Sequence, residues 1–161
     1  RPIVQARHAL RGVQLVAAMT LVAELQDFER FANPRQLMSY VGLVPSEYTS
    51  GPKRRQGAIT KAGNSAARRM LLEVAWHYQH APRVSPIIAT RHDRLPKTVT
   101  DIALAAQLRL HAKFKRLVAR RLMKNKAVVA IARELAGFVW AIGREVQASG
   151  WKGVPNEANA N

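Results

Sequence analysis

An all-α fold is what this sequence predicts, and three observations lead to it. Apolar residues recur every three or four positions over most of the chain, for example through Val13–Leu25. Capping residues, prolines and glycines stand where such segments would begin and end. Strict alternation of apolar and polar residues is confined to Gly57–Thr60, where a short hairpin is an open alternative, but we do not expect a sheet.

Three helices are expected before residue 42. The first two cover Ile3–Leu10 and Val13–Leu25. Gly12 separates them. The third is about two turns long, with Asn33 as its N-cap, Pro34 as its first residue and Gly42 just past its end. Its expected buried side consists of Leu37, Met38 and Val41.

The second half of the chain is predicted to be helical almost throughout. Asn64 or Ser65 is the expected N-cap of the first helix, and Pro96 precedes the longest one. The expected helical segments are Ser65–Ala81, one turn within Ser85–His92, Lys97–Asn125 and Ala127–Val146. The expected core residues are Leu71, Leu72, Ala75, Trp76, Leu104, Leu108, Leu117, Val129, Leu135, Phe138 and Trp140.

These helices are expected to form one compact domain over residues 1–149, followed by a flexible tail over residues 150–161. An apolar content of 48% supports a folded core. Because the chain begins without Met and shows no signal-peptide pattern, we expect it to be a piece of a longer protein.

The charge balance indicates a polyanionic partner. Lys and Arg number 26 against 10 acidic residues, for a formal net charge of +16. Nucleic acid is the first expectation for such an excess, and an acidic membrane surface is the second. The absence of cysteine excludes disulfides and fits a bacterial cytoplasm, in association with the nucleoid. No apolar run is long enough to span a bilayer, so we expect no membrane partner.

A long basic loop, at about residues 43–63, is the most unusual feature of the sequence. Ser50 and Gly51 stand at its centre and are followed by Lys53, Arg54 and Arg55. Guanidinium groups can hold a phosphate and stabilise charge that develops on it, and a serine hydroxyl can act as a nucleophile when it is activated. Ser-Gly is also a common turn pair, so the residues alone leave an ordinary turn as the alternative.

A second basic segment lies within the long helix expected after Pro96. Arg109, Lys113, Arg116 and Arg120 follow steps of three or four and therefore share one face. No acidic residue occurs between Asp101 and Glu134 to neutralise them. A phosphate backbone would relieve their mutual repulsion, which favours nucleic-acid contact over a merely solvated face.

Metal-dependent chemistry is not expected within this chain. Its only aspartates are Asp27, Asp93 and Asp101, whereas a metal-dependent nuclease needs several converging carboxylates. His77 and His80 could pair on a helix, but no third ligand follows them. We therefore predict neither a metal site nor a cofactor in this part of the protein.

One long segment has a specific resemblance. The residues "FERFANPRQLMSYVGLVPSEYTSGPKRRQGAITKAGNSAARRMLLEVAW" (Phe28–Trp76) and "VVAIARELAGFVWAI" (Val128–Ile142) resemble the C-terminal domain of bacterial insertion-sequence transposases of the one-ten group, including its eleven-eleven branch. The pilin-gene inverting recombinases are related to that group. The resemblance covers most of Arg11–Val146.

The resemblance implies a catalytic serine recombinase domain. Ser50 would be the nucleophile that forms a covalent phosphoserine link with DNA. The residues expected to bind DNA or RNA are Gly51, Lys53, Arg54, Arg55, Lys61, Arg68, Arg69, Lys113, Arg116 and Arg120. An N-terminal RuvC-like domain, absent from this chain, would carry a DEDD carboxylate set with Mg²⁺. A guide RNA and other copies of the protein would be further partners, and the isolated chain would be inactive.

The family also implies a helix-hairpin-helix near the N-terminus. Gly12 is present, but Gln14 stands where a second glycine is usual, so we expect a degenerate hairpin. Outside this family, the same residues would fit a non-catalytic helical module that binds DNA or RNA through charge. Replacing Ser50 would distinguish the two hypotheses, because only the first needs that hydroxyl.

Overall fold

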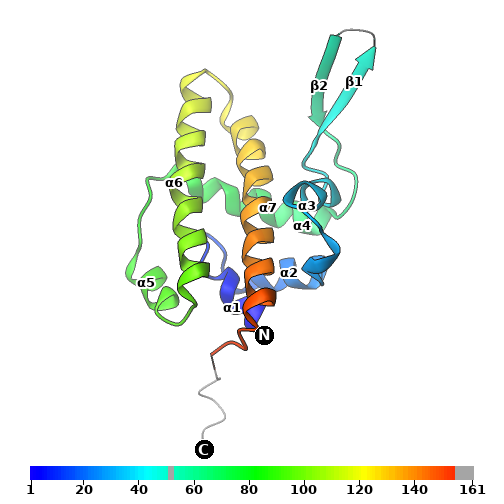
Figure 1. Cartoon of the computed structure of the whole chain (residues 1–161). Helices are drawn as coiled ribbons and strands as arrows, with labels where there is room; N and C mark the ends of the chain where they lie inside the picture. The colour runs from blue at the N-terminus through cyan, green and yellow to red at the C-terminus, as the bar shows by residue number, and fades with distance from the viewer. Residues whose placement is uncertain (51–52, 155–161) are drawn as a thin grey trace, which may run out of the picture.

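The computed structural model describes residues 1–50 and 53–154, with side chains described for 1–45 and 58–154. It confirms the all-α class, with one two-stranded hairpin added (Figure 1). The elements are α1 (Pro2–Arg7), α2 (Leu15–Leu25), the 3₁₀ turn η1 (Phe28–Arg30), α3 (Pro34–Tyr40), β1 (Pro45–Ser50), β2 (Lys53–Ile59), α4 (Ser65–Ala75), the 3₁₀ turn η2 (Trp76–Gln79), α5 (Pro86–His92), α6 (Lys97–Ala119) and α7 (Lys124–Ser149).

Helix α7 is the central element of the core. It packs against α1, α3, α4 and α6 (Figure 1). Its buried residues recur at helical spacing and include several small ones, which let neighbouring elements approach closely. At Gly143 an added Cβ would lie 2.7 Å from the ring of Phe28, so a larger residue there would displace the ring.

Two predicted helix caps are confirmed, and the structure adds a third. The Asn33 side chain accepts a hydrogen bond from the N–H of Gln36 at 3.1 Å. Asn64, rather than Ser65, caps α4 and accepts from the N–H of Ala67 at 2.9 Å. Ser85 caps α5, which has seven residues rather than one turn. Each side chain supplies an acceptor for an N–H that the helix itself cannot satisfy.

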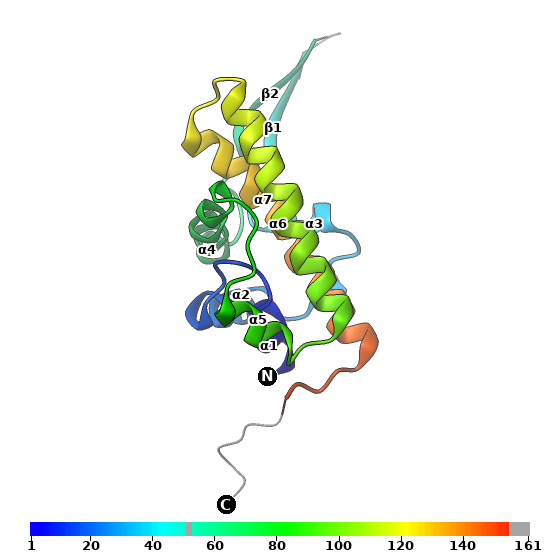
Figure 2. The same ribbon diagram turned by 90° about the vertical axis from the view of Figure 1, so that its left-hand side faces the viewer.

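The hairpin corrects the expectation that the basic loop forms no sheet. Strands β1 and β2 pair antiparallel, with Pro45 opposite Ile59, Tyr48 opposite Arg55 and an irregularity between Pro45 and Glu47. They project from the helical body as an arm, at the end where α6 turns into α7 (Figures 1 and 2). A ladder satisfies the backbone donors and acceptors of a long segment that contributes little to the core.

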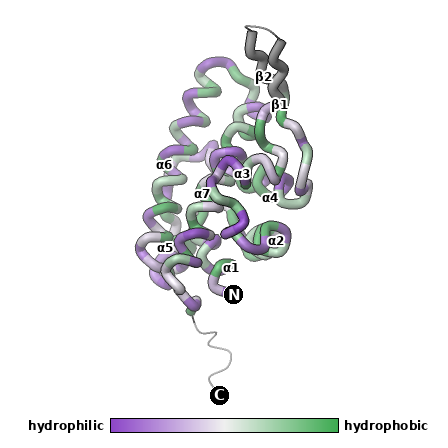
Figure 3. Tube along the Cα trace, turned by 45° about the vertical axis from the view of Figure 1, so that its right-hand side comes forward, coloured by the Kyte–Doolittle hydropathy of each residue, from purple (hydrophilic) through white to green (hydrophobic). Residues whose placement is uncertain are grey.

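The long basic helix is shorter than predicted. Helix α6 ends at Ala119, Arg121 adopts a φ of +62°, and α7 begins at Lys124, so Lys97–Asn125 is not one helix. Hydrophilic residues recur along α6 and its turn, whereas α2 is mostly hydrophobic (Figure 3).

Two predicted core residues lie at the surface. Trp76 is 40% exposed and Leu108 is 64% exposed. Leu108 falls on the outer face of α6, and Trp76 begins the 3₁₀ turn in which the helical periodicity of α4 changes. Trp140 is half-buried, and its indole N–H donates to the carbonyl of Phe31 at 2.9 Å.

The predicted helix-hairpin-helix is not confirmed as a motif. Helix α1 has only six residues, and Gly12 turns the chain towards α2 with a φ of +81°. The ring of His77 lies against Gly12, where it would collide with an added Cβ. In this structure the turn therefore packs against the rest of the domain.

Candidate nucleic-acid interface

The base of the hairpin is held by backbone hydrogen bonds to the segment that follows α3. Thr60 donates to the carbonyl of Val44 at 3.0 Å, and Lys61 donates to that of Gly42 at 3.1 Å. One step further down, the N–H of Asn64 donates to the carbonyl of Tyr40 at 2.9 Å. The two segments are thus joined below the ladder, which fixes where the arm leaves the body.

Two glycines permit this close approach. Gly42 has a φ of +71° and Gly63 a φ of +91°, in the left-handed region that favours glycine. A Cβ at Gly42 would collide with the carbonyl oxygen of Ala62, and one at Gly63 would collide with that of Tyr40. Both glycines are therefore required by the backbone crossing at the base of the arm.

Arg68 joins the two ends of the hairpin. Its Nη1 donates to the carbonyl of Val41 at 3.1 Å and to that of Lys61 at 3.0 Å. Lys61 itself is exposed and has a φ of +53°, so its carbonyl faces the guanidinium through an uncommon backbone conformation. Arg68, predicted as a nucleic-acid contact, is placed here as an anchor of the arm.

Asn64 has a second contact besides its helix cap. Its amide Nδ2 donates to Oε2 of Glu24 at 2.6 Å, which ties the start of α4 to α2. The Asn64 side chain thus caps α4, as expected, through its Oδ1 and also joins α4 to α2 through its Nδ2.

The backbone register places Ser50 among cationic residues. Ser50 ends β1 and pairs with Lys53, while Thr49 pairs with Arg54 and Tyr48 with Arg55. This is the end of the ladder farthest from the helical body (Figure 2). The predicted contact Gly51 lies outside the described residues.

On α6 the predicted basic face is divided by an acid from another helix. Glu134 of α7 accepts from Nε of Arg109 at 3.2 Å and from Nζ of Lys113 at 2.9 Å. Burial raises the pKa of Glu134, but the hydrogen bonds from Arg109 and Lys113 outweigh that effect and hold the pKa below its usual value. Lys113 is thereby half-buried and neutralised, which the spacing along α6 could not reveal.

The other predicted cations differ in whether an acidic residue pairs with them. Arg116 and Arg120 are exposed, and no ion pair involves them within the part of the chain that the structure describes. Arg69 is also exposed and forms an i, i+4 pair with Glu73 at 3.3 Å. An exposed pair of this kind is readily exchanged for a phosphate contact.

A family model described as "Transposase IS116/IS110/IS902 family" matches residues 7–92, which include the whole hairpin and its base. The chain belongs to this transposase family.

Curated relatives agree with that assignment. A putative transposase of Sinorhizobium fredii, y4qE, is 46% identical over 90% of this chain and 37% of its own length. The transposase for insertion sequence element IS1111A of Coxiella burnetii is 31% identical over 83% of this chain and 31% of its own length. That for element IS1533 of Leptospira borgpetersenii is 31% identical over 69% of this chain. The chain thus spans about a third of the length of these transposases.

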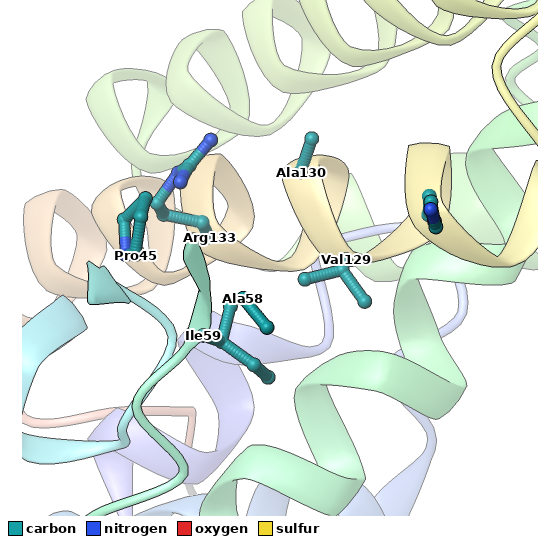
Figure 4. Close-up of a pocket in the computed structure, with 7 residues that line it drawn as sticks. Pro45, Ala58, Ile59, Val129, Ala130 and Arg133 are labelled. Carbon is teal, nitrogen blue, oxygen red and sulfur yellow. The ribbon is translucent and has the colours of Figure 1, made fainter. Parts of the chain in front are cut away.

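Two cations of this transposase chain, Lys126 and Arg133, were not among the predicted nucleic-acid contacts. Both line a cavity of about 430 Å³ between the base of the hairpin and α7 (Figure 4). The remaining lining residues are Pro45, Ala58, Ile59, Val129 and Ala130. The i, i+3, i+4, i+7 spacing on α7 was the available signal, but its meaning depends on the hairpin that lies opposite.

Two further observations limit what the described residues can do by themselves. No group of three His, Asp or Glu side chains among them is placed to hold a metal ion. No helix in the described ranges is both long and apolar enough to cross a membrane.

Proposed function

We propose that this chain is the catalytic-serine domain of an insertion-sequence transposase and that Ser50 attacks a DNA phosphodiester. The observation that carries the proposal is the position of Ser50 at the outer end of the hairpin, with its backbone paired to that of Lys53. Arg54 and Arg55 occupy the next two rungs. A serine on a projecting arm, with its backbone in register with cationic residues, suits contact with a nucleic-acid phosphate.

The proposed step is a transesterification. The oxygen of Ser50 bonds to phosphorus while the bond from phosphorus to one deoxyribose oxygen breaks. The serine proton leaves to a base, and the departing sugar oxygen takes up a proton. A phosphodiester is present before and after the step, so attack by the hydroxyl of another strand can release Ser50 without an external energy source.

Among the described residues, no group of side chains is placed to supply the metal chemistry that the family resemblance implies. The described residues hold no suitable cluster of ligands, so they do not fit a Mg²⁺ site. We propose that carboxylates of a RuvC-like domain hold Mg²⁺ and that this chain is inactive without that domain. The residues of this chain that take part in the proposed transesterification do not act through the metal.

The proposed partners follow from charge and family. A net charge of +16 favours DNA, and we extend the proposal to a guide RNA and to other copies of the full-length protein. Function in the bacterial cytoplasm, on the nucleoid, belongs to the same proposal.

Ser50→Ala tests the central claim. The full-length transposase carrying this substitution is mixed with a nicked DNA substrate that traps a covalent intermediate, and the adduct is detected on a denaturing gel. We expect adduct formation and strand exchange to fall by at least about 10³-fold, because the nucleophile is removed. DNA affinity should stay within about twofold, because no cation is lost.

Thr49→Ala is the matched control, since it removes the neighbouring hydroxyl on the same strand. It should retain the adduct. A covalent adduct that persists in Ser50→Ala would refute the proposed nucleophile. Unchanged strand exchange would favour a domain that binds DNA without catalysis.

A further inference from the structure

A groove with an apolar floor lies between the arm and α7. Pro45, Ala58 and Ile59 form its hairpin side, and Val129 and Ala130 form its α7 side (Figure 4). Its volume of about 430 Å³ falls within the range of about 300–1,000 Å³ that is usual for ligand pockets.

Two cations flank the floor on α7. Lys126 precedes Val129 by three residues, and Arg133 follows Ala130 by three, so all four lie on the face that lines the groove. Along the helix the two cations are separated by about 10 Å. No ion pair involves either side chain in the described part of the chain. The adjacent acid, Glu134, is already shared by Arg109 and Lys113.

The surroundings of the groove are also positive. Helix α7 begins at Lys124 without an acidic residue in its first turn, so its free N–H groups add positive potential at that end. Arg120 and Arg121 stand in the turn before it. The opposite wall, formed by Pro45 of β1 and by Ala58 and Ile59 of β2, carries no acidic residue. An anion with an apolar part therefore fits this groove better than a neutral or cationic partner.

We propose that the groove binds one unpaired nucleotide of the DNA strand that Ser50 attacks. The base lies on the apolar floor, and the flanking phosphates contact Lys126 and Arg133. Paired bases cannot reach such a floor, because they are stacked inside the duplex. This inference rests on the proposed function, which brings a DNA strand to the hairpin.

The length of the hairpin sets the expected position of that nucleotide. Strand β2 has seven residues, from Lys53 at the outer end of the ladder to Ile59 at the groove, and so spans about 20 Å. At a rise of about 3.4 Å per nucleotide, a strand that follows the arm reaches the groove about six nucleotides from the attacked phosphodiester.

Fluorescence of 2-aminopurine tests the inference directly. The probe is a DNA duplex with a single bulged 2-aminopurine, compared with the fully paired duplex. We expect this chain to bind the bulged duplex at least about fivefold more tightly and to change the emission of the bulged base. Ala130→Phe fills the groove without altering charge, and it should abolish both the preference and the emission change.

Lys126→Ala/Arg133→Ala removes the two flanking cations. For the bulged duplex the slope of log K against log salt concentration should fall in magnitude by about 1.5–2, as expected for two lost phosphate contacts. Arg94→Ala is the matched control, because it removes an exposed cation at the far end of the molecule, between α5 and α6. Its affinities, salt slope and emission change should remain close to those of the unaltered chain.

The outcomes separate this inference from the proposed nucleophile. If Ala130→Phe and the double substitution both leave the preference and emission change intact, the groove does not hold the nucleotide. If the unaltered chain shows no preference while Ser50→Ala still abolishes the covalent adduct, the inference fails and the proposed function stands. A preference that survives in Ser50→Ala but not in Ala130→Phe supports the groove independently of catalysis.

Discussion

Among individual residues, Arg7 has the least usual surroundings. Its side chain is fully buried, and none of its guanidinium nitrogens has a hydrogen-bond partner in the described structure. The ring of Phe28 lies 4.4 Å from the guanidinium carbon and offers a cation–π contact. Burial lowers the pKa of Arg7 to about 9, which leaves the group charged at neutral pH. An unpaired buried charge is costly, and one cation–π contact offsets only part of that cost.

Arg7→Met is therefore expected to stabilise the domain. Methionine keeps an unbranched apolar chain against Phe28 and removes the buried charge, so the free energy of unfolding should rise by about 1 kcal/mol or more. Urea denaturation at pH 7 measures the change. Arg35→Met, at an exposed position, is the control and should change stability by less than about 0.5 kcal/mol. A loss of stability in Arg7→Met would contradict this account.

Among the elements, the hairpin depends on its base more than on burial. Gly42 and Gly63 allow the backbone crossing, and Arg68 bonds the carbonyls on either side of it. Gly42, Gly63 and Arg68 all lie in the segment Phe28–Trp76 that resembles the transposase family. Part of that resemblance therefore consists of residues that support the hairpin. Ser50 can be held at a defined place only if this support is rigid.

Arg68→Gln should loosen the arm without unfolding the domain. The shorter side chain cannot bridge Val41 and Lys61, so hydrogen-exchange protection of the Thr60 and Lys61 amides should fall by at least about tenfold. Arg69→Gln is the neighbouring control, because that side chain makes only an exposed pair with Glu73. Equal protection in both variants would show that Arg68 does not anchor the hairpin.

The contact between α6 and α7 has an electrostatic part centred on Glu134. Its pKa is lowered in the folded state, so the carboxylate stabilises the fold above the unfolded pKa of about 4.3. That contribution is lost as the pH falls through the lower folded value. Glu134→Gln should cost about 1 kcal/mol at pH 7, and the difference from the unaltered chain should shrink between pH 5 and pH 3.

Urea denaturation at three pH values checks this prediction. Glu145→Gln is the control, because Glu145 is an acid that forms no ion pair in the described structure. If Glu134→Gln lowers the free energy of unfolding by the same amount at every pH, the charge of Glu134 contributes nothing to stability.

Glu134→Gln should also bind DNA more tightly, by up to about tenfold at low salt, because Arg109 and Lys113 are released.

For the whole molecule, the arm and the α6–α7 turn form two projections at one end (Figures 1 and 2). Cations occur on both, at Lys53–Arg55 in β2 and at Arg120, Arg121 and Lys124 around the turn. The groove between the arm and α7 lies where these projections meet. These cations are thus placed around a concave surface, which concentrates their attraction for a polyanion.

Much of this arrangement could be predicted from sequence. The caps at Asn33 and Asn64, the helical class and the cation excess all follow from composition or from residues within four positions of one another. The sequence alone also shows that Ser50 lies within a basic segment. The exposure of Trp76 was not, because a large apolar residue does not by itself indicate which face of a helix is covered.

By itself, the sequence determined that this chain is helical, strongly cationic and similar to a transposase domain, since these properties depend on residue types and short spacings. Only the tertiary structure decided that the basic loop is a supported hairpin, that Glu134 pairs with both Arg109 and Lys113 across separations of 25 and 21 residues, and that Lys126 and Arg133 line a groove. The physical reason is that each feature needs groups that are distant in the chain and meet only on folding. The hairpin needs the segment after α3 to meet the start of α4, and the other two need α7 to pack into the core.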